Sequence, residues 1–161
     1  MKNSVLLFSK YPLSVMSIPC KLLKILGGRE KEMIKTLMFG VERRRVLLAG
    51  NNTSLRYMIR QILEGQGRFE IVGEALDEED VLKKAAFYCP DVVLLGGSPN
   101  LNCFHASTSL KKSQPHLKVV VLSYEDNEEY RKAAQESGAS AYISLDRIDK
   151  DLPGVMRSIL R

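Results

Sequence analysis

The side chains best suited to metal or nucleophilic chemistry are few in this sequence. The three cysteines, Cys20, Cys89 and Cys103, show no Cys-x-x-Cys spacing, and neither His105 nor His116 stands at metal-ligand spacing from a cysteine pair. An odd number of thiols without paired spacing favours a reducing compartment over a secreted disulfide framework. We therefore predict a cytoplasmic protein that has no metal site and no bound cofactor.

A glycine pair follows the most apolar short segment of the chain. Residues 92–95 form a continuous apolar run between Pro90 and Gly96, which is typical of a parallel strand covered on both faces. Residues that follow the carboxyl end of such a strand lie in the crevice where open α/β sheets bind ligands. Gly96 and Gly97 bring no side chain to that place. Ser98 is the nearest hydroxyl, but no base stands beside it in sequence, so we interpret it as a turn residue.

Strand and helix patterns alternate from residue 45 onward. Acidic residues 77–80 lie at the start of a predicted helix, where the helix dipole favours them, so we interpret them as a helix start and not as a metal site. The alternation predicts an α/β domain with a doubly wound, five-stranded parallel sheet. The predicted strands are 46–49, 69–73, 92–95, 119–122 and 141–144, and the predicted helices are 55–63, 77–88, 102–112, 128–137 and 152–160.

The formal net charge of +5 is concentrated near the N-terminus. Residues 1–42 contain seven Lys and Arg against three Glu, whereas residues 43–161 contain 17 Lys and Arg against 16 Asp and Glu. The nearly neutral second part does not have the character of a nucleic-acid-binding surface. We predict a basic N-terminal extension at 1–42 and one domain at 43–161.

The extension at 1–42 is predicted to be disordered or partly helical. None of its apolar runs approaches the roughly 18 to 20 residues that a membrane-spanning helix needs. Residues 20–39 could form an amphipathic segment that lies weakly on a membrane surface or packs on a partner. A mis-assigned start is an alternative, because residues 27–32 can be encoded by an almost purely purine run of the kind that precedes bacterial start codons, and Met33 and Met38 follow.

Short segments within the predicted elements resemble a known protein family. Residues 46–161 resemble the receiver domain of bacterial two-component response regulators, particularly the subgroup that usually carries a helix-turn-helix output domain. The resemblance implies a flavodoxin-like fold with five strands in the order 2-1-3-4-5. The matching segments are RVLLA at 45–49, LR at 55–56, IVGEA at 71–75, PDVVLL at 90–95, VVVLS at 119–123 and GASAY at 138–142.

The same resemblance places four substitutions in the phosphorylation site. Receivers bind Mg²⁺ with an acidic pair after the first strand and the phosphoacceptor aspartate after the third, and here Gly50, Asn51 and Gly96 stand at those positions. Leu145 stands where the family has the lysine that pairs with the phosphoryl group. Because Mg²⁺ prefers carboxylate ligands and the transfer needs a carboxylate nucleophile, we predict a degenerate receiver that is not phosphorylated on aspartate.

Two family positions are retained. Ser123 matches the switch hydroxyl at the end of the fourth strand, and Tyr142 matches the switch aromatic on the fifth. Without a phosphoryl group to follow, we expect Ser123 to bond to nearby backbone and Tyr142 to pack beside the helix at 128–137. The resemblance also implies a partner surface formed by that helix, the fifth strand and the last helix. Its candidate contact residues are Tyr124, Tyr130, Tyr142, Asp146, Arg147 and Arg157.

These inferences predict a stand-alone pseudo-receiver that is not an enzyme. It would act in signal transduction through phosphorylation-independent contact with another signalling protein or a second copy of itself. We expect no direct DNA binding, because no output domain follows the receiver-like segment in this sequence. Two alternatives stay open: the crevice lined by Gly50, Asn51, Asn52, Gly96 and Gly97 binds an anion or small ligand through backbone amides, or the receiver is phosphorylated at a non-standard residue.

Overall fold

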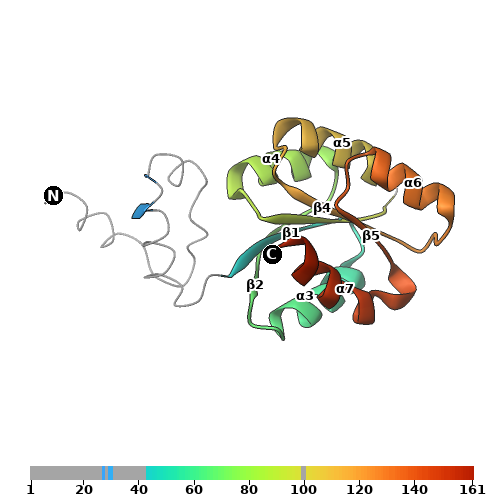
Figure 1. The fold of residues 1–161 in the computed structure, drawn as a ribbon, viewed down its shortest axis with the longest axis horizontal. Helices are drawn as coiled ribbons and strands as arrows, with labels where there is room; N and C mark the ends of the chain where they lie inside the picture. Colours follow the sequence, from blue (N-terminus) through green and yellow to red (C-terminus); the bar gives the residue numbers. More distant parts are fainter. Residues whose placement is uncertain (1–26, 28, 31–42, 99–100) are drawn as a thin grey trace, which may run out of the picture.

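The computed structural model describes residues 27, 29–30, 43–98 and 101–161. The predicted extension lies outside these residues apart from Gly27, Arg29 and Glu30, as do both alternative starts, Met33 and Met38. The described part contains a five-stranded sheet in the order β2-β1-β3-β4-β5, with every neighbouring pair parallel (Figure 1). The predicted fold and strand order are therefore confirmed. Among the described residues, no helix has the length and apolar character that crossing a membrane requires.

The strands are short and begin at the same edge of the sheet, because all run in one direction. They are β1 (Arg44–Ala49), β2 (Phe69–Ala75), β3 (Val92–Gly96), β4 (Lys118–Ser123) and β5 (Ala141–Ser144). Most extend one or two residues beyond the predicted apolar runs. At β1 the reason is pairing, since Arg44 and Arg45 align with Phe69 and Glu70 of β2 even though their side chains are not apolar.

Polar caps set the start of four of the five helices that lie within residues 43–98 and 101–161. The side chains of Asn52, Asp77, Asn102 and Asn127 each accept a backbone N–H from the first turn of the helix that follows, which satisfies a donor that has no partner inside the helix. The helices are α3 (Thr53–Glu64), α4 (Glu78–Tyr88), α5 (Cys103–Ser113), α6 (Glu128–Glu136) and α7 (Ile148–Ile159).

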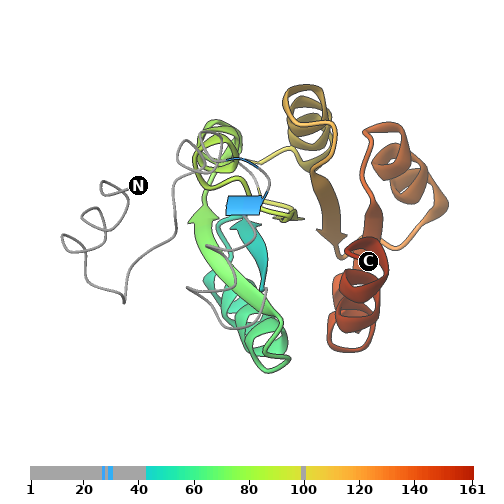
Figure 2. The same ribbon diagram turned by 60° about the vertical axis from the view of Figure 1, so that its left-hand side comes forward.

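The helices cover the sheet in two layers, as Figures 1 and 2 show. Helices α3 and α7 pack on one face, and α4, α5 and α6 pack on the other. Side chains alternate along β1, so Val46 and Leu48 face the first layer while Leu47 and Ala49 face the second. All five residues of β3 are buried, which confirms that the run at 92–95 is a strand covered on both sides.

The prediction for the last helix is wrong at its start. Helix α7 begins at Ile148, four residues before the predicted start, and a short 3-10 turn, η2 (Leu145–Arg147), precedes it. Pro153 lies inside the helix and removes one backbone hydrogen bond. Burial of Ile148, Leu152 and Met156 at four-residue spacing offsets that loss, because these side chains complete the core against α3 and the sheet.

Replacing Leu152 with alanine tests this core. Leu152 is fully buried, so Leu152→Ala is expected to lower the free energy of unfolding by about 2–5 kcal/mol through lost contacts and a residual cavity. Urea unfolding followed by circular dichroism measures the change. Leu76→Ala is the matched control, since Leu76 is 52% exposed and its truncation should shift stability by less than about 0.5 kcal/mol. Equal effects of the two substitutions would contradict the described packing of α7.

Candidate functional site

The candidate site is the crevice at the carboxyl ends of β1 and β3. Ala49 pairs with Leu95, so Gly50 and Gly96 follow side by side on adjacent strands. Gly50 has a φ of 130°, and a Cβ placed on it would lie 2.6 Å from the carbonyl oxygen of Gly96. The two backbones therefore approach so closely that Gly50 tolerates no side chain.

Apolar side chains stand where the resemblance places charged ones. A Cβ on Gly96 would lie 3.2 Å from Cδ2 of Leu55 and 3.4 Å from the carbonyl oxygen of Ala49. Leu145 is only 8% exposed and belongs to the same apolar cluster as Leu55. The side chain of Leu55 thus lies against position 96, which is expected to hold the phosphoacceptor. Position 145, which is expected to hold a lysine, is part of the hydrophobic core.

The donor set at this edge does not fit Mg²⁺. Gly50 and Gly96 offer only backbone atoms, and Asn51 offers one neutral amide oxygen, whereas Mg²⁺ sites normally include one or two carboxylates. In the part of the chain that the structure describes, no three His, Cys, Asp or Glu side chains are grouped so that they could hold a metal ion.

The glycine amides at this edge are already in use. Gly50 N–H donates to the carbonyl of Ala75 at 2.9 Å, and Gly97 N–H donates to that of Leu122 at 3.3 Å. An anion nest needs successive N–H groups that point into the crevice, so this geometry counts against the predicted backbone cradle. The hydroxyl of Ser98 is buried and makes no hydrogen bond to any described residue. The neighbouring positions of its loop, 99 and 100, lie outside the described residues.

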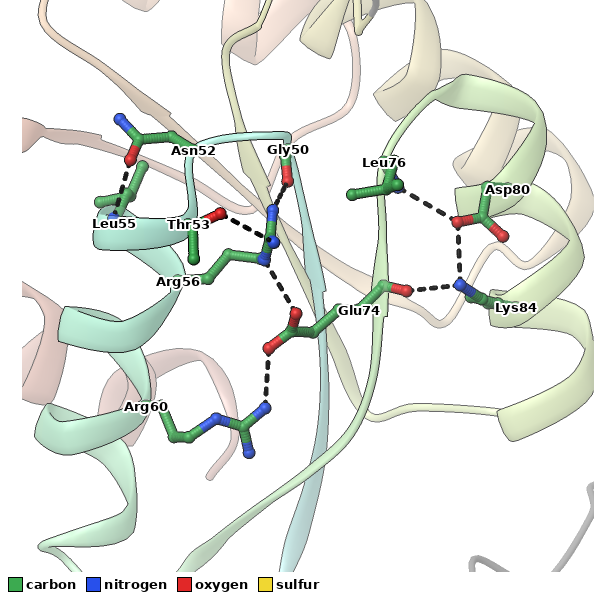
Figure 3. Close-up of polar contacts among 10 residues, drawn as sticks. All are labelled: Gly50, Asn52, Thr53, Leu55, Arg56, Arg60, Glu74, Leu76, Asp80 and Lys84. Carbon is green, nitrogen blue, oxygen red and sulfur yellow. Dashed lines mark hydrogen bonds and ion pairs between the residues drawn. The ribbon is translucent and has the colours of Figure 1, made fainter.

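An arginine holds the β1 side of the crevice, as Figure 3 shows. The guanidinium of Arg56 on α3 donates to the carbonyl oxygen of Gly50 and, at 2.9 Å, to Oε2 of Glu74 on β2. Arg60 donates to Oε1 of the same carboxylate at 2.8 Å. Glu74 therefore ties two turns of α3 to the neighbouring strand, and Arg56 fixes the loop that contains Gly50.

A lysine extends this network to α4 (Figure 3). Lys84 Nζ donates to the backbone carbonyl of Glu74 at 2.6 Å and to Oδ2 of Asp80 at 2.9 Å. The hydrogen bond from Arg60 lowers the pKa of Glu74, and the hydrogen bond from Lys84 lowers the pKa of Asp80. Both carboxylates are thus held ionised as structural groups and are committed to cations of the protein.

The retained switch residues meet at one backbone position. Ser123 Oγ accepts the N–H of Glu125 at 3.1 Å, and the hydroxyl of Tyr142 donates to the carbonyl oxygen of Glu125. Burial raises the pKa of Tyr142, so its hydroxyl stays protonated and able to donate. The hydrogen bonds join the loop after β4 to β5.

The predicted partner residues do not form one compact patch. Tyr124 is 66% exposed just after β4, and Asp146 and Arg147 are exposed in the turn just after β5. Because β4 and β5 end side by side, these three lie at the carboxyl edge of the sheet. Arg157 lies in the last turn of α7, ten residues after Arg147, which places it about 15 Å along the helix axis toward the opposite edge.

Tyr130 lies on α6 and is 37% exposed. Its ring packs edge-on against Phe104 of α5 with centroids 5.7 Å apart, so part of its surface is committed inside the domain. Of the predicted contact residues, Tyr124 is therefore the aromatic side chain that is most available to a partner.

Sequence reasoning missed the roles of Leu55, Arg56 and Glu74. Leu55 was predicted only as one residue of an apolar helix stripe, and Arg56 and Glu74 only as parts of family-like segments. A signal did exist, because Glu74 is a charged residue that follows the apolar residues of β2, and such a residue usually has a partner. The identity of that partner required the fold.

Comparison with known proteins identifies the family. Residues 46–152, more than half of the chain, match the family model described as the response regulator receiver domain. The transcriptional regulatory protein DegU of Brevibacillus brevis is 31% identical over 107 residues, which cover 66% of this chain and 45% of DegU. The response regulator protein VraR of Staphylococcus epidermidis is 32% identical over 116 residues, which cover 70% of this chain and 54% of VraR. The chain thus spans about half the length of these relatives.

Solved structures agree on the fold. A LuxR-family two-component response regulator from Aurantimonas sp. SI85-9A1 matches with a TM-score of 0.70 at 19% identity, covering 73% of this chain and 85% of that one. The signal receiver domain of the NarL response regulator from Mycobacterium tuberculosis matches with a TM-score of 0.67 at 22% identity. The match covers 73% of this chain and 97% of that one. Together with the match to the family model, the strand order and the position of the crevice, this shows that the chain belongs to the family of response regulator receiver domains.

Proposed function

We propose that this protein is a degenerate receiver that acts in two-component signalling through protein contact, without phosphorylation of an aspartate. The observation that carries the proposal is Gly96, which stands at the phosphoacceptor position against the side chain of Leu55. A receiver needs a carboxylate there to attack the phosphoryl donor and form an acyl phosphate. Glycine has no atom that can do so.

The neighbouring positions support the same conclusion independently. Gly50 and Asn51 supply no carboxylate for the metal that shields the incoming phosphoryl charge. Leu145 supplies no ammonium to pair with that charge once it has arrived. The acceptor, metal-ligand and charge-pairing positions have all lost their charged groups, so restoring one of them does not restore the reaction.

The contact between the switch residues suggests how the domain signals without phosphate. Ser123 and Tyr142 are both bound to the backbone of Glu125, which fixes the loop before α6 against β5 in one arrangement. A surface formed by α6, β5 and α7 would then be presented constitutively to another signalling protein or to a second copy. On this proposal the protein is not an enzyme, and its output depends on its abundance and on that of its partner.

The proposal does not extend to the whole of the relatives' activity. DegU is described as a transcriptional regulatory protein, but the match covers less than half of it. The nearly neutral charge of residues 43–161 gives the receiver-like segment no nucleic-acid-binding character of its own. We therefore assign the described domain a role in protein contact and assign DNA binding to no part of it.

A small-molecule phosphodonor tests the loss of aspartyl phosphorylation. Incubation of the full chain with acetyl phosphate and Mg²⁺ is expected to leave its intact mass unchanged, because no carboxylate stands at the acceptor position. Gly96→Asp is expected to give the same result, since Gly50, Asn51 and Leu145 still supply neither metal ligand nor cation. An ordinary receiver with a complete site serves as the positive control.

The chemistry of any added group distinguishes the alternatives. A gain of one phosphoryl group that hydroxylamine removes would be an acyl phosphate and would refute the proposal. A hydroxylamine-resistant gain, mapped to a residue such as Ser98, would support phosphorylation at a non-standard position instead.

A pair of glycine substitutions tests the closed backbone of the crevice. Gly50→Ala is expected to lower the free energy of unfolding by about 1–3 kcal/mol or more, because the residue has a positive φ and a Cβ would meet a carbonyl oxygen at 2.6 Å. Gly97→Ala is the control in the same crevice, since a Cβ there meets no atom within 4 Å and should change stability by less than about 0.5 kcal/mol. Urea unfolding measures both, and a stable Gly50→Ala protein would show that the crevice is more open than described.

A further inference from the structure

The opposite edge of the sheet contains a cavity that the proposed function does not use. Arg44, Asp91 and Lys118 lie at or just before the starts of β1, β3 and β4, which are neighbours at the centre of the sheet. The ends of α5 and α7 frame the same place, because both helices return to this edge. The cavity has a volume of about 480 Å³, and its lining residues are Arg44, Asp91, Lys118, Pro90 and those at 114–117 and 159–161.

The lining has an excess of positive charge. Arg44, Lys118 and Arg161 contribute three positive charges, against the carboxylates of Asp91 and of the Arg161 terminus, so the lining carries a net charge of +1. Asp91 is partly committed elsewhere, since its Oδ2 accepts the backbone N–H of Arg45 at 2.7 Å and its Oδ1 lies 3.8 Å from Arg44. Lys118 and Arg161 form no ion pair with any residue that the structure describes.

Helix polarity explains why these cations lack acidic partners. Helices α3 to α7 all start at the carboxyl edge of the sheet, and α4, α6 and α7 carry acidic residues in their first turns, where the helix dipole favours them. Most acidic side chains are thereby placed at the far edge. Lys118 and Arg161 have no acidic partner among the described residues, and Arg44 has Asp91 at 3.8 Å, so the amino edge is electrostatically positive.

The helix ends at this edge oppose an anion, and a lysine is bound to the loop that follows one of them. Carbonyl groups at the end of a helix carry partial negative charge. Lys111 Nζ donates to the carbonyl oxygens of Pro115 at 2.7 Å and Leu117 at 2.9 Å, both just beyond the end of α5. An ammonium group thus lies on two loop carbonyls of residues that line the cavity.

Part of the cavity lining is apolar. Pro90 and Leu117 are buried, and Ile159 and Leu160 are half-buried, so a ligand body could cover apolar surface while its charged group meets the cationic rim. The volume lies within the range of about 300–1,000 Å³ that is typical of small-molecule sites. A phosphate monoester carries a charge of about −1.5 to −2 at neutral pH, which is opposite in sign to the net charge of the lining.

We propose that this cavity binds a small phosphate monoester that has an apolar or aromatic body. Lys118, Arg161 and Arg44 would surround the phosphate group, and Pro90 and Leu117 would contact the body. The site lies at the edge of the sheet opposite the degenerate crevice, so it would allow a phosphorylated metabolite to regulate a receiver that cannot itself be phosphorylated on aspartate.

Phenyl phosphate is the probe that tests the site. Titration of the full chain, followed by calorimetry and by amide chemical shifts, is expected to show saturable one-to-one binding that perturbs residues 116–118 and 159–161. Phenol, which has the body without the charge, and sodium sulfate at matched ionic strength, which has the charge without the body, are expected to bind at least tenfold more weakly. Binding of sulfate as tight as that of phenyl phosphate, or no saturable binding, would overturn the proposal.

Two charge reversals locate the binding. Lys118→Glu is expected to weaken phenyl phosphate binding at least tenfold, because it replaces a cation at the rim with an anion. Lys150→Glu makes the same change in charge on an exposed residue near the start of α7, at the other edge of the sheet, and should change the affinity less than twofold. Equal losses in both variants would show a general effect of net charge and would refute the assigned site. Circular dichroism confirms that each variant is folded, and Lys118→Gln, which should weaken binding by an intermediate factor, replaces Lys118→Glu if the reversal disturbs the edge.

Discussion

Burial of the central strands on both faces is the constraint on which the rest of the structure depends. Val46 and Leu48 of β1 pack under α3 and α7, while Leu47 and Ala49 pack under the other three helices, and β3 and β4 repeat the pattern. When helices cover both faces of a sheet, polar sites form at the two ends of its strands. The crevice lies at the carboxyl ends of the strands and the basic cavity at their amino ends, so the length of the strands separates the two candidate sites.

The fold was largely readable from local patterns because those patterns agree with it. The apolar runs predicted all five strands, and Asn and Asp residues before periodic segments predicted where helices begin. The exception was α7, which was predicted at 152–160 and begins at Ile148. Local propensity was overruled there by burial of Ile148, whose neighbours in the core come from distant parts of the chain. No local window of sequence contains that information.

The site was predictable as a set of substitutions but not as a geometry. Gly50, Gly96 and Leu145 could be named from the resemblance alone, whereas the contact of Gly96 with Leu55 depends on how α3 lies against β3. Likewise, the pairing of Arg56 with Glu74 joins residues 18 positions apart through the register of β1 and β2. Close approaches and ion pairs of this kind arise from tertiary structure, so the residue types that form them do not reveal them in sequence.

The backbone of Gly96 constrains Gly50, which bears on what a restored site would need. Gly50 is required by the carbonyl oxygen of Gly96, and that requirement would persist if a carboxylate were restored at position 96. Arg56 adds a second constraint, because its guanidinium already holds the carbonyl of Gly50 in place. A metal-binding side chain at position 50 would therefore need a different path for the loop after β1. The contacts of Gly50 with Gly96 and Arg56 thus make the crevice a tightly packed structural contact, and a single substitution would not turn it into a phosphorylation site.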